Sequence, residues 1–441
     1  MKPTIGDKRI SSPEKNRTNC ARMVSCFESA TERVSFLSET MKTISTAPGT
    51  ISGQTPTITP ERLSSLDAYR GFVMFLMLAE VLQFSRVSDA LPGSKFWEFL
   101  GDQQSHVAWI GCALHDLIQP SFSFLVGVAL PFSIANRLSR SQSRGQIFRH
   151  AIYRALTLIL LGVFLRSTWT FEDTLSQIGL GYVFLFMLGF RPVRDQWIAF
   201  GVLLAGYWTA FALYPLPGPG WDYAKVGVTN DGAQVLSGFA AHWSKNSNLA
   251  WSFDTWFLNL FPRRDVFKFN GGGYATLSFI PTLATMVLGL IAGGILRRDW
   301  TGSRKVKWFA IAGAISLGVA ILIGWLGICP VVKRIWTPAW VLFSGGWCLL
   351  LLASFYGIVD VLKFRAWAFP LIVIGMNSIL AYCSEHLFGG FIKGTLIGHF
   401  SSRVFNVLGE AYSPILTGAP TLLLIWLLLY WMYRQKYFLR I

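Results

Sequence analysis

The sequence predicts an all-α polytopic membrane protein with about ten transmembrane helices and an extracytoplasmic cap loop. Hydrophobic residues make up 52% of the 441-residue chain and charged residues only 14%, whereas an average soluble protein is about 25% charged. Apolar segments of spanning length, which is about 20 residues, recur from Leu66 onward. A soluble protein of this composition would need a larger core than single domains normally build.

The predicted spans begin after a polar N-terminal region. Residues 1–60 are rich in Ser, Thr, Pro, Lys and Glu, and we expect a disordered cytoplasmic tail in which Met41 is an alternative start. Residues 61–441 then form the transmembrane domain, with 215–274 as its long extracytoplasmic loop. The predicted spans are about 66–84, 116–136, 150–166, 174–190, 197–214, 275–296, 308–328, 338–359, 368–388 and 415–433.

Basic residues predict the orientation of the chain in the membrane. They are concentrated in short loops that alternate along the sequence, and cytoplasmic loops are enriched in Lys and Arg. Both termini are therefore expected in the cytoplasm, and the aromatic-rich loop 215–274 is expected to fold as a cap over the outer mouth. These loops and the C-terminal tail carry Arg137, Arg140, Arg144, Arg149, Arg191, Arg194, Arg297, Arg298, Arg304, Lys305, Lys307, Lys363, Arg365, Arg434, Lys436 and Arg440.

Composition also argues against other classes of function. The net charge of +16 fits basic cytoplasmic loops of a membrane protein, and no aromatic-plus-basic RNA motif accompanies it, so we expect no nucleic-acid partner. The six cysteines show neither CxxC nor another metal-binding spacing, so we expect no metal and no disulfide framework. The lipid bilayer is the expected surrounding, and the sequence leaves a homodimer open.

Two imidazoles and a carboxylate stand at the predicted outer end of the second span, where His106, His115 and Asp116 precede a long apolar run. Imidazole is the best general base or acyl acceptor near neutral pH. A neighbouring carboxylate can select its tautomer and raise its basicity. The alternative for Asp116 is a simple cap of the second span.

The first span carries three further ionisable residues. Glu80 lies about three turns into the apolar helix, where a carboxylate is costly unless it faces the bundle interior or water. Alternatively, the span ends there and Glu80 is interfacial. Asp67 and Arg70 lie three residues apart, so they share a helix face and can pair. Their simpler interpretation is a helix start, with Arg70 snorkelling towards the membrane surface.

The ninth span carries an unusual number of polar residues. Ser378, Tyr382, Glu385 and His386 can share one helix face, and Asn377 precedes them. Such side chains can simply join helices by hydrogen bonds. The ionisable pair near the outer end favours a different hypothesis, in which this face lines the same outer cavity as His106.

Four motifs carry a resemblance to a known family. In this order and spacing they are RLSSLDAYRG, HVAWIGCALHDLIQPSFSFLVG, DTLSQIGLGY and GMNSILAY. Over nearly all of residues 61–441 the chain resembles the catalytic domain of the heparan-α-glucosaminide N-acetyltransferase family and its bacterial relatives. The resemblance implies a polytopic acyltransferase that moves acetyl from acetyl-CoA to a sugar amine on the far side of the membrane.

The resemblance also assigns positions. His106 stands where the family has its catalytic histidine, and Asp67, Arg70, Trp109, Asp116 and Asn377 fall on other motif positions. Two departures stand out: Glu80 replaces an asparagine near the end of the first span, and the order Glu385-His386 replaces His-Glu. In the cytoplasmic (inner) membrane of a bacterium, the acceptor would be an envelope glycan or amino sugar rather than heparan.

The leading functional hypothesis is transfer of acetyl from cytoplasmic acetyl-CoA to an amine or hydroxyl of an extracytoplasmic saccharide. His106 would act as general base or would briefly carry the acetyl group. Glu80 or Asp116 would orient it, and Asn377 would donate a hydrogen bond to the thioester carbonyl. The predicted substrate-binding residues are Asp67, Arg70, Trp109, Glu385 and His386.

Two other functions remain open from the sequence. A proton-coupled transporter or flippase of an envelope glycan or small solute would use Glu80, Glu385 and His386 as a proton relay. The sequence shows no two-half repeat of the transporter type. An inactive scaffold is the third possibility, and the polar residues of the ninth span argue against it.

Overall fold

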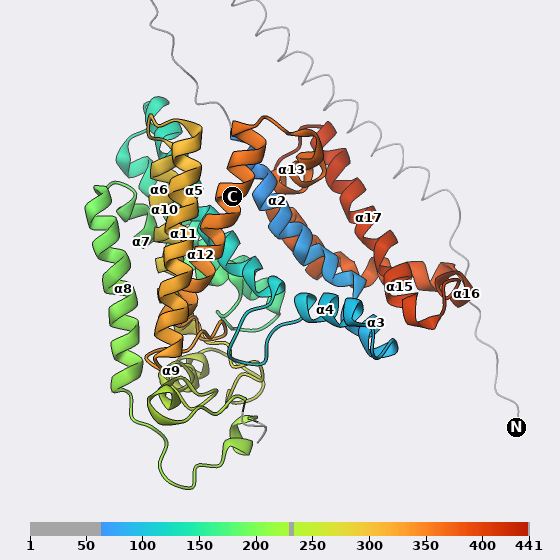
Figure 1. Cartoon of the computed structure of the whole chain (residues 1–441), viewed down its shortest axis with the longest axis horizontal. Coiled ribbons are helices and arrows are strands. Elements are labelled where there is room, and N and C mark those ends of the chain that lie inside the picture. Colours follow the sequence, from blue (N-terminus) through green and yellow to red (C-terminus); the bar gives the residue numbers. More distant parts are fainter. Residues whose placement is uncertain (1–62, 229–232, 440–441) are drawn as a thin grey trace, which may run out of the picture. The chain divides into compact units, whose positions relative to one another are not determined.

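The computed structural model describes residues 63–228 and 233–439, and helices dominate this part of the chain (Figure 1). The predicted tail 1–60, with Met41, and Arg440 lie outside the described residues. Pairing between extended segments is limited there to an isolated antiparallel bridge of Ile110 with Val332. The first eight helices are α2 (Ser64–Leu78), α3 (Phe84–Ala90), α4 (Lys95–Gln104), α5 (Ile118–Ser139), α6 (Arg144–Arg166), α7 (Thr174–Leu188), α8 (Val193–Leu213) and α9 (Leu249–Phe257).

The second half of the chain is also helical. Its helices are α10 (Phe279–Leu296), α11 (Gly302–Trp325), α12 (Pro338–Phe355), α13 (Phe369–Met376), α14 (Ser378–Ser384), α15 (Gly390–His399), α16 (Ser402–Phe405) and α17 (Ser413–Arg434). The molecule is thus an all-α polytopic membrane protein, as its composition predicts.

The count of spans is lower than the ten predicted segments. Within the described residues, eight helices are long and apolar enough to cross a membrane, and a bent pair makes a ninth if it is one span. The predicted segment 174–190 folds as α7, which has only 15 residues. At about 1.5 Å per residue, such a helix is shorter than the hydrocarbon core of a bilayer.

Local sequence explains where several helices begin. The carboxylate of Asp173 accepts hydrogen bonds from the backbone N–H groups of Leu175 and Ser176 at the first turn of α7. Thr337 accepts from the backbone N–H of Trp340 and is followed by a proline at the first position of α12. These side chains satisfy backbone donors that a helix leaves unpaired at its start.

Glycines allow the helices at the centre of the bundle to touch backbone to backbone. A Cβ on Gly127 of α5 would lie 1.9 Å from the carbonyl oxygen of Met286 in α10. A Cβ on Gly375 of α13 would likewise lie 1.9 Å from the carbonyl oxygen of Asp67 in α2. Small residues drive this kind of approach in membrane helices, where close packing replaces the hydrophobic effect.

The ninth predicted span is broken at Asn377. The helical segments Ala366–Met376 and Ser378–His399 meet there at an angle of 71°. Asn377 itself has φ −125° and ψ 41°, outside the helical region, and a π-helical turn follows at Glu385–Gly389. The sequence places Asn377 and Glu385 on a single continuous helix, and the structure therefore corrects that expectation.

The loop 215–274 contains short helices, among them α9, and packs on the bundle through its own apolar cluster. Trp243 and Ala250 of the loop contact Tyr207 and Phe211 of α8 and the buried ring of Trp109. Figure 1 shows the segment around α9 at the end of the bundle where α8 finishes. We call residues 215–228 and 233–274 the cap.

Candidate functional site

The polar residues predicted from the sequence gather around the connection between α4 and α5. His106 follows α4 directly, and Asp116 lies in the 3₁₀ turn Leu114–Leu117 that leads into α5. Nδ1 of His106 lies 2.7 Å from Oδ1 of Asp116. The Asp116 residue is fully buried, whereas the His106 side chain is 40% exposed. The carboxylate is therefore held inside the protein while the ring can meet a ligand.

Asp116 is fixed by four donors. Its Oδ2 accepts from the backbone N–H of Ala113 at 3.0 Å and of Val107 at 3.4 Å. Its Oδ1 accepts from the ammonium of Lys333 at 3.0 Å, in addition to the contact with His106. A buried carboxylate requires this degree of hydrogen bonding and charge compensation.

Lys333 is the residue that the sequence analysis missed. It lies in the loop before α12, 227 positions from His106, and its Nζ is 3.2 Å from Nδ1 of that ring. Its side chain is only 5% exposed. One signal in the sequence indicated it. Lys333 and Arg334 are basic residues in a short loop that is predicted to be extracytoplasmic, and the positive-inside rule predicts few basic residues in such loops.

The contacts select one tautomer of His106. A carboxylate oxygen 2.7 Å from Nδ1 requires a proton on that nitrogen, because two acceptors would repel. Lys333 can then donate only to Asp116, and Nε2 of His106 remains the ring atom that can accept a proton. Partial burial is the largest cause that lowers the pKa of His106, and the charge of Lys333 adds to it, while Asp116 opposes both.

A second imidazole connects this group to Glu80. The rings of His106 and His115 lie 4.8 Å apart between centroids and are tilted by 50°. Nε2 of His115 lies 3.5 Å from Oε2 of Glu80, whose side chain is 58% exposed. Glu80 therefore contacts His115 rather than His106. We call His106, His115, Asp116, Lys333 and Glu80 the histidine site.

The pair Glu385–His386 lies on the side of Glu80. Nδ1 of His386 is 3.0 Å from Oε2 of Glu385, and its ring stacks on Tyr382 at 4.7 Å. Helix α15, which follows the pair, reaches the same end of α2 as Glu80, because Nζ of Lys393 donates to Oε1 of Gln83 at 3.1 Å. Both members of the pair are about a quarter exposed. The pair is thus partly accessible and lies near the end of α2 that carries Glu80.

Trp109 has a different position from the one expected of a substrate-binding residue. Its ring is only 1% exposed, and its Nε1 donates to the carbonyl oxygen of Trp243 in the cap at 3.0 Å. Arg334 ties the same loop to the cap, because it donates to the carbonyl oxygens of Val107 and Gly272. In this structure Trp109 offers no free face to a sugar and anchors the loop that carries His106.

Three predicted residues lie elsewhere, at the crossing of α2 and α13. Arg70 NH1 is 3.4 Å from Oδ1 of Asp67 in the first turns of α2. The Asn377 amide donates to the carbonyl oxygen of Tyr437 and accepts from the backbone N–H of Leu439, each at 3.0 Å. We call Asp67, Arg70, Asn377 and residues 437–439 the asparagine site.

The two sites are far apart. Asp67 and Glu80 are separated by 13 positions on the continuous helical stretch Ser64–Leu82, which corresponds to about 20 Å along the axis. The side-chain amide of Asn377 forms hydrogen bonds with the C-terminal segment and not with His106. The predicted hydrogen bond from Asn377 to a thioester held at His106 therefore gains no support from the geometry.

Comparison with known proteins agrees with this description. No known family profile matches the chain. The human heparan-alpha-glucosaminide N-acetyltransferase is 25% identical over 427 residues, which cover 87% of this chain and 60% of the human protein. The mouse enzyme of the same name is 25% identical over 370 residues, covering 74% of this chain and 53% of the mouse protein.

The fold and the apolar helices define a multi-pass membrane protein, and the two relatives to which it is similar are named as N-acetyltransferases. The chain spans 60% of the human relative's length and 53% of the mouse relative's length. The chain is thus distantly similar to the heparan-alpha-glucosaminide N-acetyltransferases, which confirms the resemblance predicted from the four motifs.

Proposed function

We propose that this protein transfers acetyl from cytoplasmic acetyl-CoA to an amine or hydroxyl of an extracytoplasmic saccharide. The observation that carries the proposal is the contact of His106 with Asp116 at 2.7 Å, beside the buried ammonium of Lys333. The contact with Asp116 keeps the proton on Nδ1, so Nε2 of the partly exposed imidazole can accept a proton. The names of the two relatives supply the reaction class.

In the direct form of the reaction, Nε2 of His106 removes the proton of the acceptor N–H or O–H as that atom attacks the thioester carbonyl. The new C–N or C–O bond forms, the C–S bond breaks, and the imidazolium returns its proton to the departing thiolate. In the covalent form, Nε2 attacks the thioester carbonyl and the C–S bond breaks, which releases the thiolate of coenzyme A. The acceptor then attacks the acetyl group on the ring, the N–acetyl bond breaks, and the proton of the acceptor goes to the released thiolate. Both forms balance with acetyl-CoA and one acceptor.

Asp116 and Lys333 have complementary roles in this scheme. Asp116 holds Nδ1–H and stabilises the imidazolium that forms during transfer. Lys333 compensates the buried carboxylate and, with partial burial of the ring, lowers the pKa of His106, so the ring is neutral and able to accept a proton at pH 7.

Acetyl-CoA is a long molecule, so its two ends can bind at sites that lie far apart. We place the thioester at the histidine site and the approach of coenzyme A along α2, on the side of the asparagine site. Arg70, whose side chain is 24% exposed, can then attract the phosphates, and Asp67 sets its direction. In this arrangement, the residues at the α2–α13 crossing attract coenzyme A, and the C–S bond breaks at the histidine site.

The acceptor would bind at the mouth formed by Glu80, Glu385 and His386. Glu80 is more than half exposed and the pair Glu385–His386 is partly exposed, so carboxylate oxygens are available to sugar hydroxyls or to an amino group. Carboxylates accept hydrogen bonds from such donors. The predicted topology places this mouth and the cap on the extracytoplasmic side, with both termini in the cytoplasm.

The test uses the purified full chain, isotopically labelled acetyl-CoA and an amino sugar such as glucosamine. His106→Ala should lower acetyl transfer by about 10²–10⁴-fold, the usual contribution of a positioned base. His399→Ala is the matched control, because His399 is exposed and its ring contacts the backbone of its own helix. Equal elution and melting of both variants shows that folding is intact; unchanged transfer by His106→Ala would refute the proposal.

A proton-coupled transporter is the second candidate. The observation that favours it is the sequence of ionisable contacts from Asp116 through His106 and His115 to Glu80, with Glu385–His386 beside it. Such groups conduct protons in transporters. Proton-coupled flux into proteoliposomes that is lost in Glu80→Gln, without any acetyl transfer by the unmodified protein, would favour this function.

A further inference from the structure

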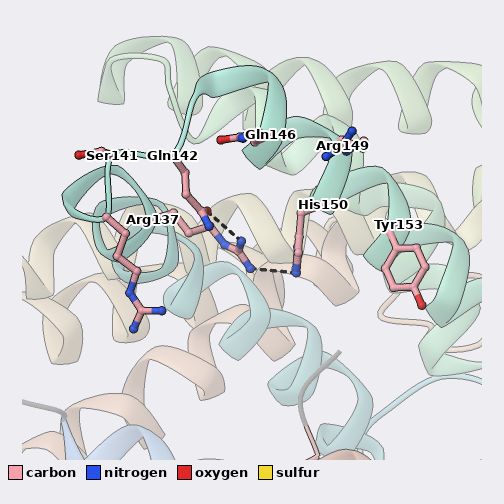
Figure 2. A pocket seen from close by; sticks show the side chains of 8 residues that line it. Arg137, Ser141, Gln142, Gln146, Arg149, His150 and Tyr153 are labelled. Carbon is pink, nitrogen blue, oxygen red and sulfur yellow. Dashed lines mark hydrogen bonds between the residues drawn. The ribbon is translucent and has the colours of Figure 1, made fainter. Parts of the chain in front are cut away.

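A basic pocket lies at the other end of α5, where the chain turns into α6 (Figure 2). Its volume is about 660 Å³. Among the described residues, those that line it include three arginines, Arg137, Arg140 and Arg149, and no carboxylate. The pocket therefore presents three positive charges with no neighbouring acid in its lining to neutralise them.

One of these arginines is held in place. Arg137 donates to Oε1 of Gln142 at 3.2 Å and to Nε2 of His150 at 2.9 Å. Figure 2 shows its guanidinium directed towards both partners, from the loop and from α6 respectively. Arg137 is half-buried, whereas Arg140 and Arg149 are exposed. A guanidinium fixed by two hydrogen bonds, with two exposed guanidinium groups in the same pocket, provides planar, charge-assisted hydrogen bonding that suits a phosphate group.

An exposed apolar stripe leads away from this pocket along α6. Arg149 and Tyr153 line the pocket, and Leu156, Leu160 and Phe164 continue the same helix face at spacings of three and four residues. These three side chains are 54%, 60% and 67% exposed. A ligand with a charged head in the pocket would therefore find apolar surface for its tail directly beside it.

The position of the pocket separates it from the histidine site. α5 has 22 residues, so Asp116 and Arg137 lie at opposite ends of a helix of about 33 Å. Between them, Gly127 touches the backbone of α10, and a Cβ on Gly289 of α10 would lie 2.0 Å from the carbonyl oxygen of Phe124. The pocket and the histidine site therefore lie at opposite ends of a closely packed helix pair, and the two share no residue.

We propose that the pocket binds the phosphate headgroup of an anionic phospholipid, whose acyl chains lie along the Leu156–Phe164 face of α6. Clustered Arg and Lys residues at the cytoplasmic surface attract anionic lipids. The concave lining and the fixed guanidinium distinguish this pocket from a basic loop that only anchors the helices by charge.

The test compares lipid binding by the purified full chain in neutral detergent. Phosphatidylglycerol and phosphatidylcholine with the same acyl chains are titrated, and bound lipid is counted by native mass spectrometry. We expect one saturable site for phosphatidylglycerol, weakened by roughly 10-fold or more in R137Q/R140Q/R149Q. The matched control R298Q/K307Q/K363Q removes the same number of charges from exposed positions of the other basic loops and should bind as the unmodified chain does.

Arg149→Glu provides a second variant that leaves the hydrogen bonds of Arg137 intact, and it should weaken phosphatidylglycerol binding even if the triple variant fails to fold. Coenzyme A and inorganic phosphate are added as competitors. If both triple variants lose phosphatidylglycerol binding equally, the binding depends on net charge alone and the proposal is overturned. Displacement of the lipid by coenzyme A at low concentration would also overturn it, in favour of a nucleotide site.

Discussion

The histidine site and the asparagine site differ in how they are built. The histidine site brings together a loop, a helix start and a second loop, and it keeps Asp116 and Lys333 buried as an ion pair. The asparagine site forms where two helices cross at Gly71 and Gly375, and the Asn377 amide is bonded to backbone groups. In the histidine site, charged groups surround a partly exposed imidazole, whereas the asparagine site joins segments of the fold.

The largest expected effect comes from Asp116→Asn. The substitution replaces the carboxylate that holds Nδ1–H by a neutral amide and leaves the Lys333 ammonium buried without its countercharge, so we expect acetyl transfer to fall by about 10²–10⁴-fold. Stability should fall by about 3–5 kcal/mol, the usual cost of breaking a buried pair. Turnover with labelled acetyl-CoA and thermal melting measure the two effects.

The double variant D116N/K333M separates those effects. With both charges removed, melting should recover towards that of the unmodified chain, because no unpaired charge remains, while transfer stays low. If Asp116→Asn alone keeps full activity, the histidine site is not the reaction centre and the contrast between the two sites fails.

A smaller effect is expected for Asn377→Ala. It removes both hydrogen bonds to the C-terminal segment, and leaving buried polar groups unpaired costs about 1–3 kcal/mol. Transfer per folded molecule should fall by less than roughly 10-fold, since the amide is not near His106. Denaturant unfolding and single-turnover transfer check this. A loss of transfer as large as that of Asp116→Asn, at unchanged stability, would make the asparagine site catalytic.

Lys333→Met breaks the same buried pair and so also lowers stability, but its effect on acetyl transfer, a shift in pH dependence, is the smallest that we expect. The charge of Lys333 lowers the pKa of His106, so its removal raises that pKa. His106 must be neutral to act as a base, and the acid limb of the kcat/KM profile should therefore move to higher pH. Lys305→Met, which removes a lysine bonded only to the carbonyl oxygen of Leu296, should leave the profile in place. A profile unchanged in Lys333→Met would show that Lys333 does not act on the base.

The fold class and the pairing of His106 with Asp116 could be predicted from the sequence. Apolar length and basic loops predict the spans, and His106 and Asp116 lie close in sequence, so their pairing could be anticipated. Lys333 could not be anticipated as a partner, because a contact across 227 positions depends on how two loops pack. Asn377 was misplaced for a related reason: helical periodicity assumes a continuous helix, and the chain bends at that residue.

The bridge between Ile110 and Val332 has a consequence for the order in which the protein is made. Residues 105–116 leave the ribosome more than two hundred positions before Lys333. Until then the Asp116 carboxylate has no countercharge from that loop. The histidine site is therefore completed late in biosynthesis, and a nascent chain that ends before Lys333 holds His106 and Asp116 without the buried ammonium that pairs with the carboxylate.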